Sequence, residues 1–213
     1  MKVEKYLVLN KYFLGLFGEE DNRELLRYLK KSVEEGESDG LTNFAISLMT
    51  KGGVKLPKDE LKRYDQNIQE YLRTINQSRP ERIRLKYFQY LAILFTEIFL
   101  DRLKNQKWEF LAKLNDFVNS NSLEKKVRET VGEFSEEDLK KLAFWMATGS
   151  GKTLIMHINY LQFLRYKPFE PDNILLITPN EGLSKQHYEE MQKSGIPCRL
   201  YSENPNSSGQ REH

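Results

Sequence analysis

The spacing of hydrophobic residues divides the chain into two parts. Up to about residue 140, apolar side chains recur at intervals of three and four positions, which predicts amphipathic helices. Beyond Leu142, short continuous apolar runs alternate with helical patterns. This alternation is typical of the opening of a parallel α/β domain. We expect helices at 22–31, 56–76, 83–103, 107–117 and 153–166, and strands at 142–145, 173–179 and 197–201.

The helix predicted at 83–103 is the most apolar of these segments. Its stripe of Leu85, Phe88, Leu91, Phe95 and Phe99 is wider than a single face requires. A stripe of this width is expected of a helix that packs on two sides. We therefore expect this helix to be buried between neighbours.

A glycine-rich loop separates the predicted strand at 142–145 from the helix that follows. Its sequence is Met146-Ala147-Thr148-Gly149-Ser150-Gly151-Lys152-Thr153. Two glycines let the backbone curl so that successive N–H groups point at phosphate oxygens. The start of the helix adds unpaired N–H donors and the positive end of the helix dipole. The pattern therefore predicts that Thr148, Gly149, Ser150, Gly151, Lys152 and Thr153 bind the phosphates of ATP.

Two residues of this loop are the catalytic candidates. In such loops the lysine, here Lys152, reaches the β- and γ-phosphates, and the hydroxyl of Thr153 binds the Mg²⁺ ion of the nucleotide. The strict pattern has glycine where this chain has Met146. The competing interpretation is a Gly-Ser turn that happens to precede a lysine. The order of strand, loop and helix favours the phosphate site.

Two segments resemble motifs of superfamily 2 helicases of the DEAD/DEAH-box type. Phe144 to Thr153 resembles motif I, and it is most similar to the branch that includes the helicase (Res) subunits of type III restriction enzymes, where Met or Ala often replaces the first glycine. Asn173 to His187, with its Thr-Pro turn, resembles motif Ia of the same family. The resemblance implies a RecA-like domain with a parallel sheet that binds ATP and Mg²⁺ and moves along DNA.

The resemblance also implies contacts outside the phosphate loop. Thr178, Lys185 and Gln186 correspond to positions beside the nucleic-acid backbone, where phosphate contact is the expected mode. Their alternative interpretation is a helix-capping threonine and two solvated side chains. Many enzymes of this superfamily have an aromatic-Gln element upstream of motif I, and Gln89 is the candidate here. Its amide carries both a donor and an acceptor for the adenine edge. Its distance from Lys152 in the sequence is longer than this element requires, so an exposed helix glutamine is an equal alternative.

The chain contains no apolar strand followed by Asp-Glu after Lys152. Helicases of this type need such an acidic motif II for Mg²⁺ and for the attacking water, and they need a second domain that supplies an arginine finger. We therefore expect the chain to be the N-terminal portion of a longer enzyme, truncated before motif II. By itself it should hydrolyse ATP at no meaningful rate.

Composition narrows the remaining possibilities. The net charge is only +2, so nucleic acid must be bound by local patches. The single cysteine excludes an intrachain disulfide and fits a reducing compartment. No stretch has the length of a membrane span, which predicts a cytoplasmic protein without membrane contact.

Together these patterns predict an α/β protein. A mainly helical N-terminal region would occupy residues 1–140, with 83–105 as a possible adenine-recognition helix. A truncated RecA-like P-loop domain with a parallel sheet would occupy 141–213. The predicted function is that of an ATP-dependent DNA helicase or translocase, with DNA favoured over RNA and with restriction or modification subunits as partners. The alternatives are another P-loop enzyme, such as a small-molecule kinase, and a non-catalytic interaction module with a vestigial loop.

Overall fold

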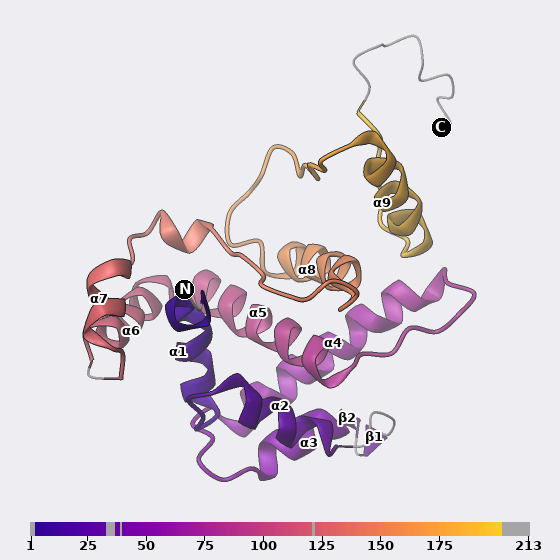
Figure 1. The fold of residues 1–213 in the computed structure, drawn as a ribbon. Coiled ribbons are helices and arrows are strands. Elements are labelled where there is room, and N and C mark those ends of the chain that lie inside the picture. Colours follow the sequence, from indigo (N-terminus) through magenta and orange to yellow (C-terminus); the bar gives the residue numbers. More distant parts are fainter. Residues whose placement is uncertain (1–2, 33–36, 39, 121, 202–213) are drawn as a thin grey trace.

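The protein is an assembly of helices in a computed structural model, which describes residues 3–32, 37–38, 40–120 and 122–201 (Figure 1). Its α-helices are α1 (Val8–Leu16), α2 (Asn22–Lys30), α3 (Asn43–Thr50), α4 (Lys58–Gln77), α5 (Tyr87–Asn105), α6 (Lys107–Asn119), α7 (Lys125–Val131), α8 (Lys152–Tyr166) and α9 (Glu181–Lys193). Two short 3-10 helices are η1 (Val3–Tyr6) and η2 (Asp138–Lys140), and two strands are β1 (Glu37–Ser38) and β2 (Leu41–Thr42).

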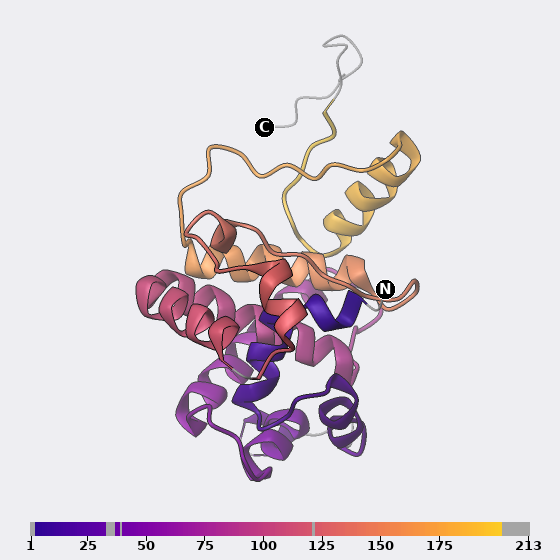
Figure 2. The ribbon, with the colours of Figure 1, turned by 60° about the vertical axis from the view of Figure 1, so that its left-hand side comes forward.

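Helix α5 lies at the centre of this assembly. It packs against α2, α4, α6 and α8, as the width of its apolar stripe predicts (Figures 1 and 2). Ile93, Leu94 and Ile98 have no exposed surface. Helix α8, which follows the predicted boundary at residue 140, packs against both α4 and α5. The helix behind the glycine-rich loop is therefore anchored in the helical core.

Local sequence determines where the long helices begin. Pro57 precedes the first residue of α4, and Asp59 and Glu60 occupy its first turn, where carboxylates favour the positive end of the dipole. Asp21 caps α2, because its side chain accepts a hydrogen bond from the backbone N–H of Arg23 at 2.8 Å. The helices predicted at 22–31 and 56–76 are observed at Asn22–Lys30 and Lys58–Gln77.

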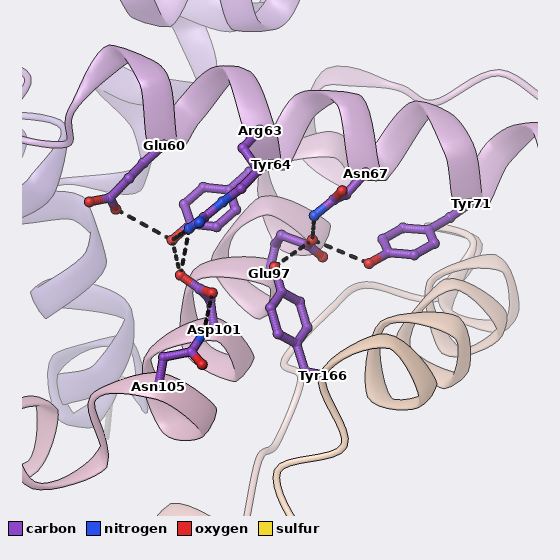
Figure 3. A network of polar contacts seen from close by, with 9 residues as sticks. All are labelled: Glu60, Arg63, Tyr64, Asn67, Tyr71, Glu97, Asp101, Asn105 and Tyr166. Carbon is purple, nitrogen blue, oxygen red and sulfur yellow. Dashed lines mark hydrogen bonds and ion pairs between the residues drawn. The ribbon is translucent and has the colours of Figure 1, made fainter.

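A buried carboxylate ties α8 to α4 and α5 (Figure 3). Glu97 of α5 has no exposed surface, and its Oε1 accepts hydrogen bonds from Asn67 Nδ2 at 2.8 Å and from the hydroxyls of Tyr71 at 3.2 Å and Tyr166 at 2.8 Å. Its Oε2 accepts from Gln162 Nε2 at 2.6 Å. Burial raises the pKa of Glu97, while these donors oppose that effect. Three helices thus share one acceptor, which fixes α8 against the core.

The prediction of a parallel sheet in a RecA-like domain is wrong for the described residues. Their only sheet is the two-stranded antiparallel pair of β1 and β2, and the segments 142–145, 173–179 and 197–201 have no regular secondary structure. Their apolar side chains are exposed instead: Trp145 by 72%, Leu175 by 78% and Ile177 by 87%. An apolar run becomes a strand only when neighbouring backbone completes its hydrogen bonds. Among the described residues no such neighbour lies beside these segments.

Candidate nucleotide-binding site

The loop before α8 has the backbone geometry that its glycines predict. Gly149 and Gly151 have φ values of 77° and 81°, in the left-handed region that favours glycine. The backbone N–H of Ser150 donates to the carbonyl of Ala147 at 3.3 Å, which closes a turn. Gly151 is the N-cap residue of α8, so the helix begins directly at Lys152. The chain therefore turns sharply and presents the first N–H groups of α8 at the end of the loop.

The lysine side chain crosses its own loop. Lys152 Nζ donates to the carbonyl oxygen of Ala147 at 2.8 Å and to that of Met146 at 3.3 Å. The ammonium group is thus held beside the loop backbone, on an exposed side chain. Thr153 follows in the first turn of α8 and is half-buried. The cation, the hydroxyl and the helix N-terminus lie within two residues of one another.

Gln89 lies against this loop although the two are 61 residues apart in sequence. Its Nε2 donates to the carbonyl of Ser150 at 2.9 Å, and its Oε1 accepts from the backbone N–H of Lys86 at 2.9 Å, which caps α5. The residue is only 7% exposed. A Cβ added to Gly151 would lie 2.4 Å from Gln89 Nε2, so the glycine is needed for this close approach. The fold therefore brings together the two elements that sequence analysis had singled out.

The loop fits the phosphate groups of a nucleotide. The Ser150 Oγ atom is buried and has no hydrogen-bond partner among the described residues. The early N–H groups of α8 are unpaired by the nature of a helix start. A phosphate oxygen is the kind of acceptor that such donors and a nearby ammonium bind. For Mg²⁺ the loop offers the hydroxyl of Thr153, and the described residues contain no cluster of three or more metal-binding side chains.

The segment that resembles motif Ia lies on a separate helix. Thr178 precedes α9, and its hydroxyl bonds to the Ser184 hydroxyl at 2.6 Å. Lys185 pairs with Glu181 at 2.9 Å on the exposed surface of α9. Gln186 is also exposed. These three predicted contacts therefore gather at the N-terminal half of α9, and α9 lies on the far side of α8 from the core (Figure 1).

A buried polar cluster, which sequence analysis missed, fastens the other end of α9. Arg79, in the segment between α4 and α5, donates to Ser194 Oγ at 2.7 Å and to Glu190 Oε2 at 3.2 Å. Ser194 Oγ is also 2.8 Å from Nδ1 of His157 on α8. The pKa of His157 is lowered to about 4, mainly by burial and then by the charge of Arg79, with His187 adding to this and Glu190 opposing it. Nothing in the local pattern signals this cluster, because its members come from three distant segments.

A family model described as "Type III restriction enzyme, res subunit" matches residues 102–212, more than half of the chain. The chain belongs to this family. The match spans the glycine-rich loop, α8 and α9, while Gln89 and Arg79 lie outside it. At the level of the Res family, membership supports an ATP-dependent, helicase-like function and an association with nucleic acid.

Two further comparisons add no relative. Neither the curated proteins nor the solved structures contain a match to this Res-family chain. Within the described ranges, no helix is both long and apolar enough to cross a membrane. The family match and the loop geometry are therefore the two observations that bear on function.

Proposed function

We propose that this chain is part of an ATP-dependent DNA helicase or translocase and that residues 148–153 hold the phosphates of ATP. The observation that supports this most strongly is the loop at the start of α8, with its two left-handed glycines and its lysine beside them. Residues 141–213 would contribute this nucleotide site, and residues 1–140 the helical region that supports it. In the whole enzyme, restriction or modification subunits would be the partners, as the family name suggests.

Each residue of the loop has a distinct task in this proposal. The N–H groups that follow Gly149 and Gly151 donate to phosphate oxygens. Lys152 exchanges its bonds to the Met146 and Ala147 carbonyls for the more strongly charged phosphate oxygens. Thr153 offers its hydroxyl to Mg²⁺, which neutralises phosphate charge when it is bound with the nucleotide.

Gln89 has the capacity to bind adenine while it contacts the loop. A side-chain amide has two N–H donors and two acceptor positions. One of each is used by Ser150 and Lys86, so one donor and one acceptor remain. An adenine edge presents one acceptor and one donor side by side, which is the complement of that pair. We therefore assign Gln89 to base selection as well as to support of the loop.

The N-terminal half of α9 is the proposed contact with DNA. The ion pair between Lys185 and Glu181 is exposed on both sides, by 61% and 82%, and an exposed pair of this kind contributes little because water and salt screen it. Lys185 is therefore free to exchange this carboxylate for a phosphate. Thr178 and Gln186 would add neutral hydrogen bonds to the same backbone.

Calorimetric titration with ATP tests the nucleotide site. The parent chain should bind ATP, and Lys152→Ala should weaken this binding by about tenfold or more, because it removes a charged donor from the phosphates. Lys126→Ala, which removes an exposed lysine on α7, is the matched control and should bind like the parent. Equal affinities for the parent and Lys152→Ala would refute the assignment of the loop.

The same titration tests Gln89. Gln89→Ala should lose about 1–3 kcal/mol of ATP binding, the value expected when a hydrogen-bonded partner is removed. The affinity for GTP should change much less, since the guanine edge does not present the donor and acceptor that complement the Gln89 amide. Gln106→Ala, an exposed glutamine between α5 and α6, is the control. Equal losses for both nucleotides would leave Gln89 as a loop support only.

A further inference from the structure

A wide groove lies on the side of the helical region that carries the C-terminal half of α4. One wall is α4 itself, the other is the segment 79–85 that leads to α5, and the floor includes Phe44 and Tyr90. Its volume is about 1380 Å³. Pockets for single small molecules have volumes of roughly 300–1,000 Å³. This groove is larger and open, which suits an elongated ligand.

The described lining of the groove is strongly basic. It contains four arginines, Arg73, Arg79, Arg82 and Arg84, and one carboxylate, Glu70. That carboxylate is already paired with Arg165 of α8. The whole chain carries a net charge of only +2, so this concentration of arginine is a local feature. A polyanion is the ligand that such a surface attracts.

Two of these arginines are available to a ligand. Arg73 on α4 and Arg82 on the opposite wall are both exposed, and neither forms an ion pair with a residue that the structure describes. Arg79 is committed to Glu190 and Ser194 of the α9 region. Arg73 and Arg82 thus face the groove from its two walls with their charge uncompensated.

The groove is formed in advance of any ligand. Asn76 of α4 bonds twice to Ile83 across it: its Nδ2 donates to the carbonyl at 3.0 Å, and its Oδ1 accepts the N–H at 2.7 Å. This pair holds the segment 79–85 at a fixed distance from the helix. Gln66 and Gln77 also line the groove and add neutral donors beside the arginines. A ligand therefore meets a rigid surface, which lowers the entropic cost of binding.

We propose that this groove binds a single nucleic-acid strand through its phosphate backbone, with Arg73 and Arg82 as the main contacts. The proposal rests on the proposed function and adds a second contact surface to the one on α9. The groove reaches α9 at its C-terminal end, because Arg79 lines the groove and also bonds to Glu190, whereas the contacts proposed above lie in the N-terminal half of that helix. A strand that leaves the groove at Arg79 therefore meets the C-terminal end of α9 and would have to follow the helix to reach Lys185.

The test is fluorescence anisotropy of the full chain with a labelled thymidine homopolymer, measured over a series of salt concentrations. Each phosphate contact to a single strand contributes about 0.7 to the slope of log affinity against log salt. The double variant Arg73→Gln/Arg82→Gln should therefore reduce this slope by about 1.4 and weaken binding at low salt. Lys126→Gln on α7 removes one positive charge far from the groove and should leave the slope unchanged.

Hydrogen exchange provides a second readout that does not depend on the variants. The N–H of Ile83 is bonded only to the Asn76 side chain and lies outside regular secondary structure, so its exchange should become slower when the oligonucleotide covers the segment. An unchanged slope in the double variant together with unchanged exchange would overturn the proposal. Equal displacement by polyglutamate would also overturn it, because the groove would then bind any polyanion.

The failure of this proposal is distinguishable from failure of the proposed function. If Lys185→Gln lowers oligonucleotide affinity and Arg73→Gln/Arg82→Gln does not, DNA binding on α9 stands and the groove is excluded. If Lys152→Ala abolishes ATP binding both in the parent and in the Arg73→Gln/Arg82→Gln variant, the nucleotide site stands whether or not the groove binds a strand. If the parent chain does not bind the oligonucleotide at all, both contact surfaces are excluded.

Discussion

Replacement of Gly151 by alanine should destabilise the protein more than the same replacement of Gly149, although both glycines have left-handed backbone. An alanine in that conformation costs roughly 1–2 kcal/mol. A Cβ on Gly149 would meet no atom within 4 Å, so Gly149→Ala should cost only this amount. A Cβ on Gly151 would lie 2.4 Å from Gln89 Nε2, and the amide must move away from the loop.

The cost of that movement follows from the bonds of Gln89. Its donation to the Ser150 carbonyl at 2.9 Å is lost, and a buried amide that is left unpaired costs about 1–3 kcal/mol. Gly151→Ala should therefore lower the free energy of unfolding by about 2–5 kcal/mol. Urea denaturation of the two alanine variants measures the difference between them.

A double-mutant cycle isolates the contact with Gln89. In a Gln89→Ala background the clash is absent, so Gly151→Ala should then cost no more than Gly149→Ala. Equal costs of the two glycine variants in the parent would refute the contact between Gln89 and the loop. If Gly151→Ala still lowers the free energy of unfolding more than Gly149→Ala in the Gln89→Ala background, the extra destabilisation does not come from a clash with Gln89.

Three further predictions concern buried polar groups of the fold. The pKa of His157 is about 4 in the folded chain and 6.5 in an unfolded one, so its contribution to stability is complete above pH 6.5 and is lost as pH falls towards 4. In urea denaturation between pH 4 and 6.5, the stability of His157→Gln should therefore depend less on pH than that of the parent, and an identical dependence would contradict the assignment. Arg79→Met should release the C-terminal end of α9 and accelerate hydrogen exchange there, whereas Arg82→Met, at an exposed site, should change stability by less than about 0.5 kcal/mol. Glu97→Gln replaces a shared acceptor by a group that also donates, and it should lower the free energy of unfolding by about 1–3 kcal/mol. The side chain of Glu70 is half-exposed, so Glu70→Gln should lower it by less than about 1 kcal/mol, and equal losses for the two variants would exclude a special role of the buried carboxylate.

Helix positions were accessible from sequence because their signals are local. Pro57 and the carboxylates after it fixed the start of α4, and the wide apolar stripe of α5 indicated burial on more than one side. The position of the glycine-rich loop was equally local, since a strand-like run, the glycines and the lysine follow one another directly. Such signals depend on residues a few positions apart, so they can be recognised before the fold is known.

The sheet and the polar clusters were not accessible in the same way. The run Ile174 to Ile177 has the composition of a buried strand, but a strand also requires partners, and the described chain leaves these side chains exposed. The cluster of Arg79, Ser194 and His157 joins segments more than thirty residues apart. The contact between Gln89 and the loop was predictable only in part. The residue could be named from its pattern, but only the fold could bring it to Ser150.

Amide chemical shifts during titration with ADP or pyrophosphate show whether the loop before α8 is a preformed phosphate site. We expect shifts concentrated at Gly149, Gly151, Lys152 and Thr153, because these N–H groups surround the proposed phosphate position. Lys152→Ala should require much higher ligand concentrations for the same shifts. An absence of shifts at these four residues at millimolar ligand, or shifts of equal size throughout α1 to α3, would contradict the claim.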